Sequence, residues 1–191
     1  MFSTILNNIP PDQIALLISL LLITGIFAGT IAGLFGIGGG VVIVPALYYI
    51  FTLAEIDEQF RMHLAVGTSL ANIIPTSIIS AYSHYQKKAV DFNLIKIVTP
   101  SLIIGVILGA LVVSNISGSI LMLIYAFLLF NIALLFFFWQ DRWQLGSIFP
   151  TNYLKHVYGS SIGFISTIIG IGGGSLSTPL LKIYNFEIHR A

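Results

Sequence analysis

The sequence predicts an all-α polytopic membrane protein, and two observations carry that prediction. The chain has 191 residues, of which 57% are hydrophobic and only 8% are charged, whereas a typical soluble domain has about 25% charged residues. Apolar runs of about 20 residues, the length that crosses a bilayer, recur along the chain. The net charge of +1 gives no sign of a nucleic-acid partner. We therefore expect the lipid bilayer to be the main partner of this chain.

Seven apolar segments follow one another along the chain, and we expect each of them to be helical. They lie at 13–35, 41–54, 62–83, 97–114, 119–139, 154–169 and 175–186. The second and seventh segments are short, because a helix of about 13 residues covers roughly 20 Å of a hydrocarbon core that is about 30 Å thick. Each of these two short segments follows a cluster of glycines.

The basic residues predict how these segments are oriented in the membrane. The loop at 55–61 has three acidic residues and one arginine, whereas the loop at 87–96 has three lysines and one aspartate. Lysine and arginine are enriched in cytoplasmic loops. If the Lys87 loop is cytoplasmic and successive loops alternate between the two sides of the membrane, seven of the eight basic residues lie inside. We expect the Lys87 and Lys88 loop in the cytoplasm and the N-terminus outside.

The sequence contains an internal repeat. "GIGGGVVIVPAL" begins at Gly36 and "GIGGGSLSTPLL" begins at Gly170, and in the same register the stretch at 25–47 matches the stretch at 159–181. The predicted topology starts the first copy outside and the second copy inside, so the two copies are inverted. Inverted repeats whose short hydrophobic segments are interrupted by glycine indicate the binding site of a secondary transporter.

The repeat also predicts how the chain is divided. Residues 1–139 form a first membrane repeat of about five hydrophobic segments, and residues 140–191 begin a second, inverted repeat. The first motif is followed by a span that begins "HLAVGTSLAN", whereas the second is followed by "EIHRA" at the end of the chain. We expect the second repeat to be incomplete in this chain.

The two glycine clusters have two competing interpretations. Glycine allows the helix to break, and the amides freed at the start of the next helix favour an anion. Alternatively, the glycines serve only close helix packing, as GxxxG ladders at Gly25, Gly105 and Gly159 do. A dinucleotide-binding fold is excluded because the third glycine of its GxGxxG motif is missing. A phosphate-binding P-loop is excluded because its Gly-Lys-Ser/Thr ending is missing. The first interpretation makes the glycines substrate-binding residues: Gly36, Gly38, Gly39, Gly40, Gly170, Gly172, Gly173 and Gly174. We expect Pro45, Pro75 and Pro179 to mark structural breaks, with Pro75 kinking its helix.

The span at 62–83 carries a polar stripe. The residues of the stripe are spaced three or four apart, which places them on one helical face: Ser69, Asn72, Thr76, Ser80 and Ser83, with Thr68 beside them. One interpretation is hydrogen bonding between helices, and the other is a translocation path. Asn72 is the first choice for contact with a solute, because its amide can donate two hydrogen bonds to an anion. His63 and His84 flank the stripe, either as proton-coupling groups or as interfacial residues without a role.

Four stretches resemble the TauE/SafE-type transporters of sulfite and organosulfonates. They are "GLFGIGGGVVIVPAL", "AVGTSLANI" at 65–73, "YQKKAVD" at 85–91 and "GIGGGSLSTPLL". The resemblance implies a multi-pass protein of the inner membrane, built from two repeats, that moves a small sulfur-containing anion.

These observations favour a secondary transporter whose anion is held by the glycine breaks together with Thr68, Ser69 and Asn72. The alternative is a membrane scaffold or assembly protein that uses its glycines only for packing. We expect no enzyme, since the sequence has no HExxH motif, no paired carboxylates within the membrane and no cysteine. No catalytic residue, metal or other cofactor is predicted.

Overall fold

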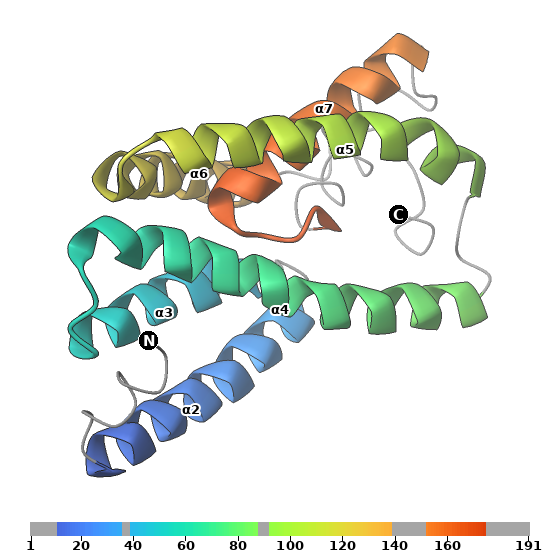
Figure 1. The fold of residues 1–191 in the computed structure, drawn as a ribbon. Coiled ribbons are helices and arrows are strands. Elements are labelled where there is room, and N and C mark those ends of the chain that lie inside the picture. Colours follow the sequence, from blue (N-terminus) through green and yellow to red (C-terminus); the bar gives the residue numbers. More distant parts are fainter. Residues whose placement is uncertain (1–10, 36–38, 88–91, 139–151, 175–191) are drawn as a thin grey trace.

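The computed structural model describes residues 11–35, 39–87, 92–138 and 152–174, which form six helices (Figure 1). This confirms the all-α prediction and six of the seven predicted helical segments; the seventh, at 175–186, lies outside the described residues. The division into repeats at residue 139 remains a prediction. The helices are α2 (Pro11–Phe35), α3 (Gly40–Leu53), α4 (Glu58–Gln86), α5 (Phe92–Asn115), α6 (Gly118–Phe138) and α7 (Asn152–Ile169).

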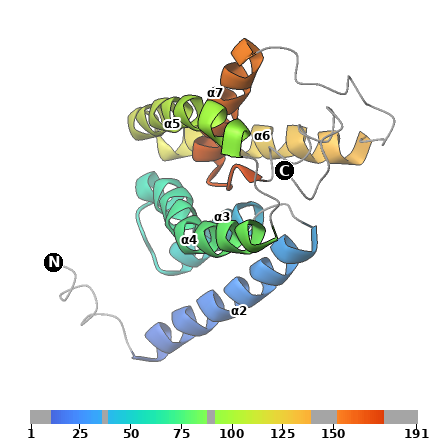
Figure 2. The same cartoon turned by 90° about the vertical axis from the view of Figure 1, so that its right-hand side faces the viewer.

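The helices form two groups that face each other. Helices α2, α3 and α4 lie together on one side, and α5, α6 and α7 lie together on the other (Figures 1 and 2). The groups meet where α4 packs against α6 and α7. In Figure 1, α2 and α7 run in opposite directions across the molecule.

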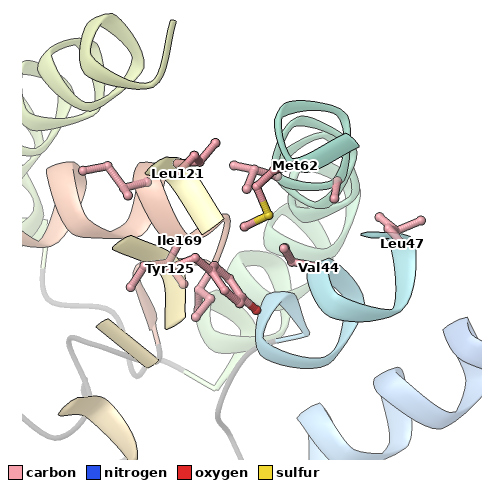
Figure 3. Close-up of a cluster of buried hydrophobic side chains, with 10 residues drawn as sticks. Val44, Leu47, Met62, Leu121, Tyr125 and Ile169 are labelled. Carbon is pink, nitrogen blue, oxygen red and sulfur yellow. The ribbon is translucent and has the colours of Figure 1, made fainter. Parts of the chain in front are cut away.

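A compact apolar core joins α3, α4, α6 and α7. Figure 3 shows Tyr125 of α6 with its hydroxyl pointing toward the start of α3, and that hydroxyl donates a hydrogen bond to the Val41 carbonyl at 3.3 Å. Because the core draws on four helices, it fixes where the two groups of helices meet. The fully or almost fully buried members are Val44, Leu47, Met62, Ala65, Val66, Leu121, Tyr125, Ile168, Ile169 and Ile171.

The beginning of α4 is held in place by its neighbours. The Asp57 side chain caps the helix by accepting a hydrogen bond from the Gln59 amide at 3.1 Å. His63 contacts the Val113 carbonyl of α5 through Nε2 at 3.0 Å. Gly118, the first residue of α6, lies so close that a Cβ atom there would be 2.7 Å from the Gln59 carbonyl oxygen. These contacts fix the direction in which α4 leaves the loop.

Helices α5 and α7 pack closely through small residues. A Cβ atom at Gly105 would lie 2.0 Å from the Ser160 carbonyl oxygen, and one at Gly163 would lie 2.4 Å from the Leu102 carbonyl oxygen. Gly109 meets Phe164 further along, so the two helices run parallel. The predicted topology requires this shared direction. Two of the predicted packing ladders are therefore confirmed. The third is not packed here, because no described atom lies within 4 Å of a Cβ at Gly25, Gly29 or Gly33.

The outer surface of the helices is apolar. Among the described residues, two helical stretches are long and apolar enough to cross a membrane, Glu58–Gln86 and Ile95–Asn115. Shorter apolar stretches lie at Ile18–Ile31, Gly40–Leu53 and Gly118–Leu134. Large side chains such as Ile26 and Phe127 are exposed on these helices. Monomeric soluble proteins rarely expose apolar surface so extensively. In a membrane protein, the lipid of the bilayer covers such a surface.

Neither Pro45 nor Pro75 ends a helix, and the kink expected at Pro75 stays a prediction. Helix α3 continues through Pro45, and α4 continues through Pro75. A proline removes one backbone hydrogen bond, and the turns on either side remain helical. The third proline, Pro179, lies outside the described residues. Helix α2 ends at Phe35 and α3 begins at Gly40.

The repeat supplies a matched pair of substitutions that tests the α5–α7 packing. We expect Gly163→Val to destabilise the protein by about 1–3 kcal/mol, because the new side chain would overlap the Leu102 backbone. Gly29→Val occupies the corresponding repeat position in α2, and we expect no loss of stability because no described atom lies within 4 Å of a Cβ there. Thermal unfolding of the purified chain in detergent measures both. Equal losses from the two variants would contradict this view of the packing.

Candidate functional site at the junction of the glycine motifs

The two glycine motifs, which lie far apart in the sequence, meet in space. Gly40 is the first residue of α3, and a Cβ atom there would lie 2.2 Å from the Gly170 carbonyl oxygen and 2.8 Å from the Ile171 Cα atom. Real Cβ contacts are essentially never that short, so only glycine fits. The backbones of the two motifs are therefore in direct contact. We call this contact, with the Ser69 side chain that completes it, the glycine junction.

Helix α7 ends in a Schellman motif at the glycine junction. Gly170 has the left-handed φ of +69° that glycine adopts readily. The Ile171 amide donates to the Ser166 carbonyl at 3.1 Å, which is the bond that defines this motif. The Ser166 hydroxyl donates in turn to the Ile171 carbonyl. The end of α7 therefore satisfies polar groups that would otherwise be buried without a partner.

Ser69 of α4 joins the first repeat to the end of α7. Its hydroxyl donates to the Gly170 carbonyl at 2.7 Å, and the residue is 0% exposed. A serine hydroxyl has a single proton to donate, so this side chain has no donor left for an anion. The expectation that Ser69 binds the substrate is corrected: the structure places it between helices, which was the alternative interpretation of the polar stripe.

The rest of the polar stripe is exposed. Thr68 and Asn72 lie one turn apart on α4, and both are exposed. The Thr76 hydroxyl donates to the carbonyls of Asn72 and Ile73 on its own helix, at 3.1 and 3.0 Å. From residue 71 to residue 86 every residue of α4 is exposed except the half-buried Ile73. The stripe thus begins at the buried Ser69 and continues along the exposed second half of α4.

The remaining glycines of the motifs are less enclosed than Gly40 and Gly170. Gly39 precedes α3 and receives no side-chain cap, and its carbonyl accepts from the amides of Val42 and Ile43. Gly172 lies against Ile73, with 3.6 Å between a built Cβ and the Ile73 Cγ2 atom. Gly173 and Gly174 are half-buried and exposed, respectively. Gly36 and Gly38 lie outside the described residues.

Two polar side chains that hold this region together, Ser166 and Tyr125, were not among the residues predicted from the sequence. Ser166 stands four residues before Gly170, one turn before the helix ends, where a hydroxyl can reach the carbonyl beyond the glycine. Tyr125 is a phenol among apolar residues, and a buried phenol usually has a hydrogen-bond partner, here Val41. Those signals were present in the sequence, but neither identifies the partner.

Ser69→Ala tests the contact between α4 and the end of α7. The substitution leaves the buried Gly170 carbonyl without its side-chain donor, which costs about 1–3 kcal/mol. Thr68→Ala is the control, because Thr68 is the exposed neighbour of Ser69. Thermal unfolding should show a lower midpoint for Ser69→Ala than for Thr68→Ala. An unchanged midpoint for Ser69→Ala would show that the hydrogen bond contributes nothing.

Adjacent glycines allow a sharp test of the backbone contact. In Gly40→Ala the new methyl group meets the Gly170 carbonyl at 2.2 Å, so the helices must separate and the protein should lose about 1–3 kcal/mol. In Gly39→Ala the nearest described atom is Cδ1 of Ile43 at 3.0 Å, the end of a flexible side chain that can move. We expect Gly39→Ala to unfold near the wild-type temperature. Equal destabilisation by both would contradict the contact.

Comparison with known proteins identifies similar sequences but no similar solved structure. A family model described as sulfite exporter TauE/SafE matches residues 21–191. A probable membrane transporter protein of Haemophilus influenzae is 34% identical over 91% of this chain and 66% of its own length. Similar proteins of Methanocaldococcus jannaschii (32% identical, 94% and 67% of the two lengths) and Bacillus subtilis (30%, 86% and 67%) bear the same description. No solved structure matches the chain. The chain thus spans about two thirds of the length of these relatives.

Proposed function

Because the chain belongs to the TauE/SafE family of membrane transporters, we propose that it moves a small anion across the bilayer. The family description names sulfite export, and it supports sulfite as the substrate and export as the direction; an organosulfonate is the alternative substrate of this proposal. The relatives are described as probable membrane transporters without a named substrate. The protein catalyses no reaction in this proposal, and it needs no cofactor.

The exposed polar stripe of α4 is the observation that carries this proposal. Polar side chains on a membrane helix face other helices or water, since lipid cannot satisfy them. Ser69 faces α7, whereas Thr68, Asn72 and the hydroxyls that follow are exposed along a helix whose other face is apolar. The stripe starts at the glycine junction and leads toward the end of α4. In this proposal it provides a polar path that leads away from the glycine junction along α4.

An anion on this path would be held by dipoles rather than by fixed cations. The residues from 62 to 86 include no lysine or arginine. The Asn72 amide can donate two hydrogen bonds, and the Thr68 hydroxyl can donate one. Helix α3 begins at Gly40 without a side-chain cap, so the positive end of its dipole adds to the attraction. We propose Thr68 and Asn72 as substrate contacts, with Gly39, Gly172, Gly173 and Gly174 lining the same region.

Alternating access would follow from movement of one repeat against the other. Helices α2 and α7 carry corresponding residues of the repeat, and their opposite directions in Figure 1 support an inverted arrangement. The glycine junction is the place where the two motifs touch. In this proposal the protein lies in the inner membrane, with the Lys87 and Lys88 loop in the cytoplasm and the N-terminus outside.

A membrane scaffold is the second candidate, and the packed glycines favour it. Gly40, Gly105 and Gly163 all meet backbone atoms of another segment, so these glycines serve packing whatever else the protein does. A scaffold would show no solute flux and would retain a partner on affinity purification. The exposed stripe of α4 has no role in that account.

Sulfite flux through the reconstituted chain tests the transport proposal. We expect liposomes containing the chain to take up sulfite, and Asn72→Leu to reduce the rate at least about tenfold, because two amide hydrogen bonds are worth more than about 1.4 kcal/mol. Ile78→Leu is the control, because Ile78 is 64% exposed on the opposite face of α4 from Ser69. An entrapped sulfite-reactive dye reports uptake. Wild-type flux equal to that of empty liposomes would refute transport, and an unchanged rate for Asn72→Leu would refute this path.

A further inference from the structure

We propose that the face of α2 formed by Gly25, Gly29 and Gly33 is a docking surface for one particular membrane helix, the counterpart of α5 in a second repeat. We call this surface the α2 glycine face. The proposal rests on the internal repeat and on an interface that is already present in the structure. It does not depend on which solute the protein moves.

The interface that serves as the template joins α7 to α5. Gly159, Gly163 and Thr167 follow one another at intervals of four residues on α7, and all three face α5. A Cβ atom at Gly159 would lie 2.4 Å from the Ser101 Oγ atom, and Thr167 lies 3.0 Å from a Cβ built at Gly109. On α5 the matching residues are also small and four apart, at Ser101, Gly105 and Gly109. Two stripes of small residues thus bring the helices into backbone contact.

The repeat maps the α7 stripe directly onto α2. The register that aligns Gly170 with Gly36 relates Gly159 to Gly25, Gly163 to Gly29, and Thr167 to Gly33. In α2 all three positions are glycine, so the face is at least as flat as its counterpart. No described atom lies within 4 Å of a Cβ at any of them. The surface that is buried in one copy of the repeat is open in the other.

The open face does not serve the contact between α2 and α3. Among the residues of α2 whose burial is described, Ala28 is fully buried. It lies about 100° around the helix from Gly29 and about 60° from Gly25, so the covered side of α2 borders one edge of the α2 glycine face and leaves its centre open. Exposed neighbours such as Leu22 and Ile26 border it and extend the apolar surface that a second helix would contact.

The interface between α5 and α7 indicates what kind of helix would bind the α2 glycine face. It is an apolar membrane helix with small residues at three positions four apart, and it runs parallel to α2, as α5 runs parallel to α7. A second copy of this chain fits poorly, because the small-residue stripe of its α5 is already covered by its own α7. The relatives are half as long again as the part of them that this chain spans, which leaves room for a further helix.

Co-expression tests this docking surface. The chain, carrying an affinity tag, is produced together with the portion of the Haemophilus influenzae relative that it leaves unmatched. We expect the two pieces to purify together from detergent. Gly29→Val should lower capture at least about tenfold, because a branched side chain holds the helices apart. Ile23→Val is the matched control, since Ile23 is 64% exposed and lies on the opposite side of α2 from Gly25.

Two further measurements keep the outcome decisive. The thermal midpoint of Gly29→Val should equal that of the wild type, which shows that lost capture does not come from unfolding. The chain has no cysteine, so Gly29→Cys provides a single thiol, and oxidation should leave it monomeric in the captured complex. Failure of the wild-type chain to capture the fragment, capture that Gly29→Val leaves unchanged, or a disulfide-linked dimer of Gly29→Cys would each overturn the proposal. Because this experiment measures capture rather than flux, its result does not depend on whether the protein transports sulfite.

Discussion

The contact between the backbones of Gly40 and Gly170 is the constraint on which the rest of the fold depends. It brings the start of α3 against the end of α7 at a distance that no other residue allows. Helix α4 completes the contact through Ser69, and the apolar core closes around it. Each of the two groups of helices contributes one side of this junction, so the relation between the groups is decided by a few backbone atoms.

A helix that ends in the interior of a protein must find partners for its last polar groups, because a buried polar group without a hydrogen bond is costly. At the end of α7 three devices meet this requirement together. The Schellman turn uses the Ser166 carbonyl, the Ser166 hydroxyl reaches Ile171, and Ser69 donates to Gly170. The region is therefore a finished structural element as well as a candidate site, and its serines are committed to backbone partners. In the proposed site the solute therefore contacts other groups, the exposed Thr68 and Asn72 among them.

The glycines of this protein do two different physical jobs that look identical in the sequence. Gly170 is needed for its backbone conformation, since its φ of +69° is unfavourable for other residues. Gly40, Gly105 and Gly163 lie in or at the start of ordinary helices and are needed because a neighbouring backbone occupies the space of a side chain. The glycines of α2 belong to the second kind by their place in the repeat. In this structure, however, no described neighbour fills the space beside them.

The sequence by itself determined the all-helical membrane class, six helices at nearly their observed positions, the repeat and the family resemblance. These follow from local composition and periodicity, because a bilayer demands long apolar helices. Only the tertiary structure decided which of the similar residues do what. The spacing placed Ser69 and Asn72 on one helical face as equals, yet the approach of α7 buries one and leaves the other exposed. The prolines looked like breaks, but α3 and α4 continue through two of them. Such outcomes depend on which segment comes to lie beside a residue, and that neighbour is set by contacts between residues far apart in the chain.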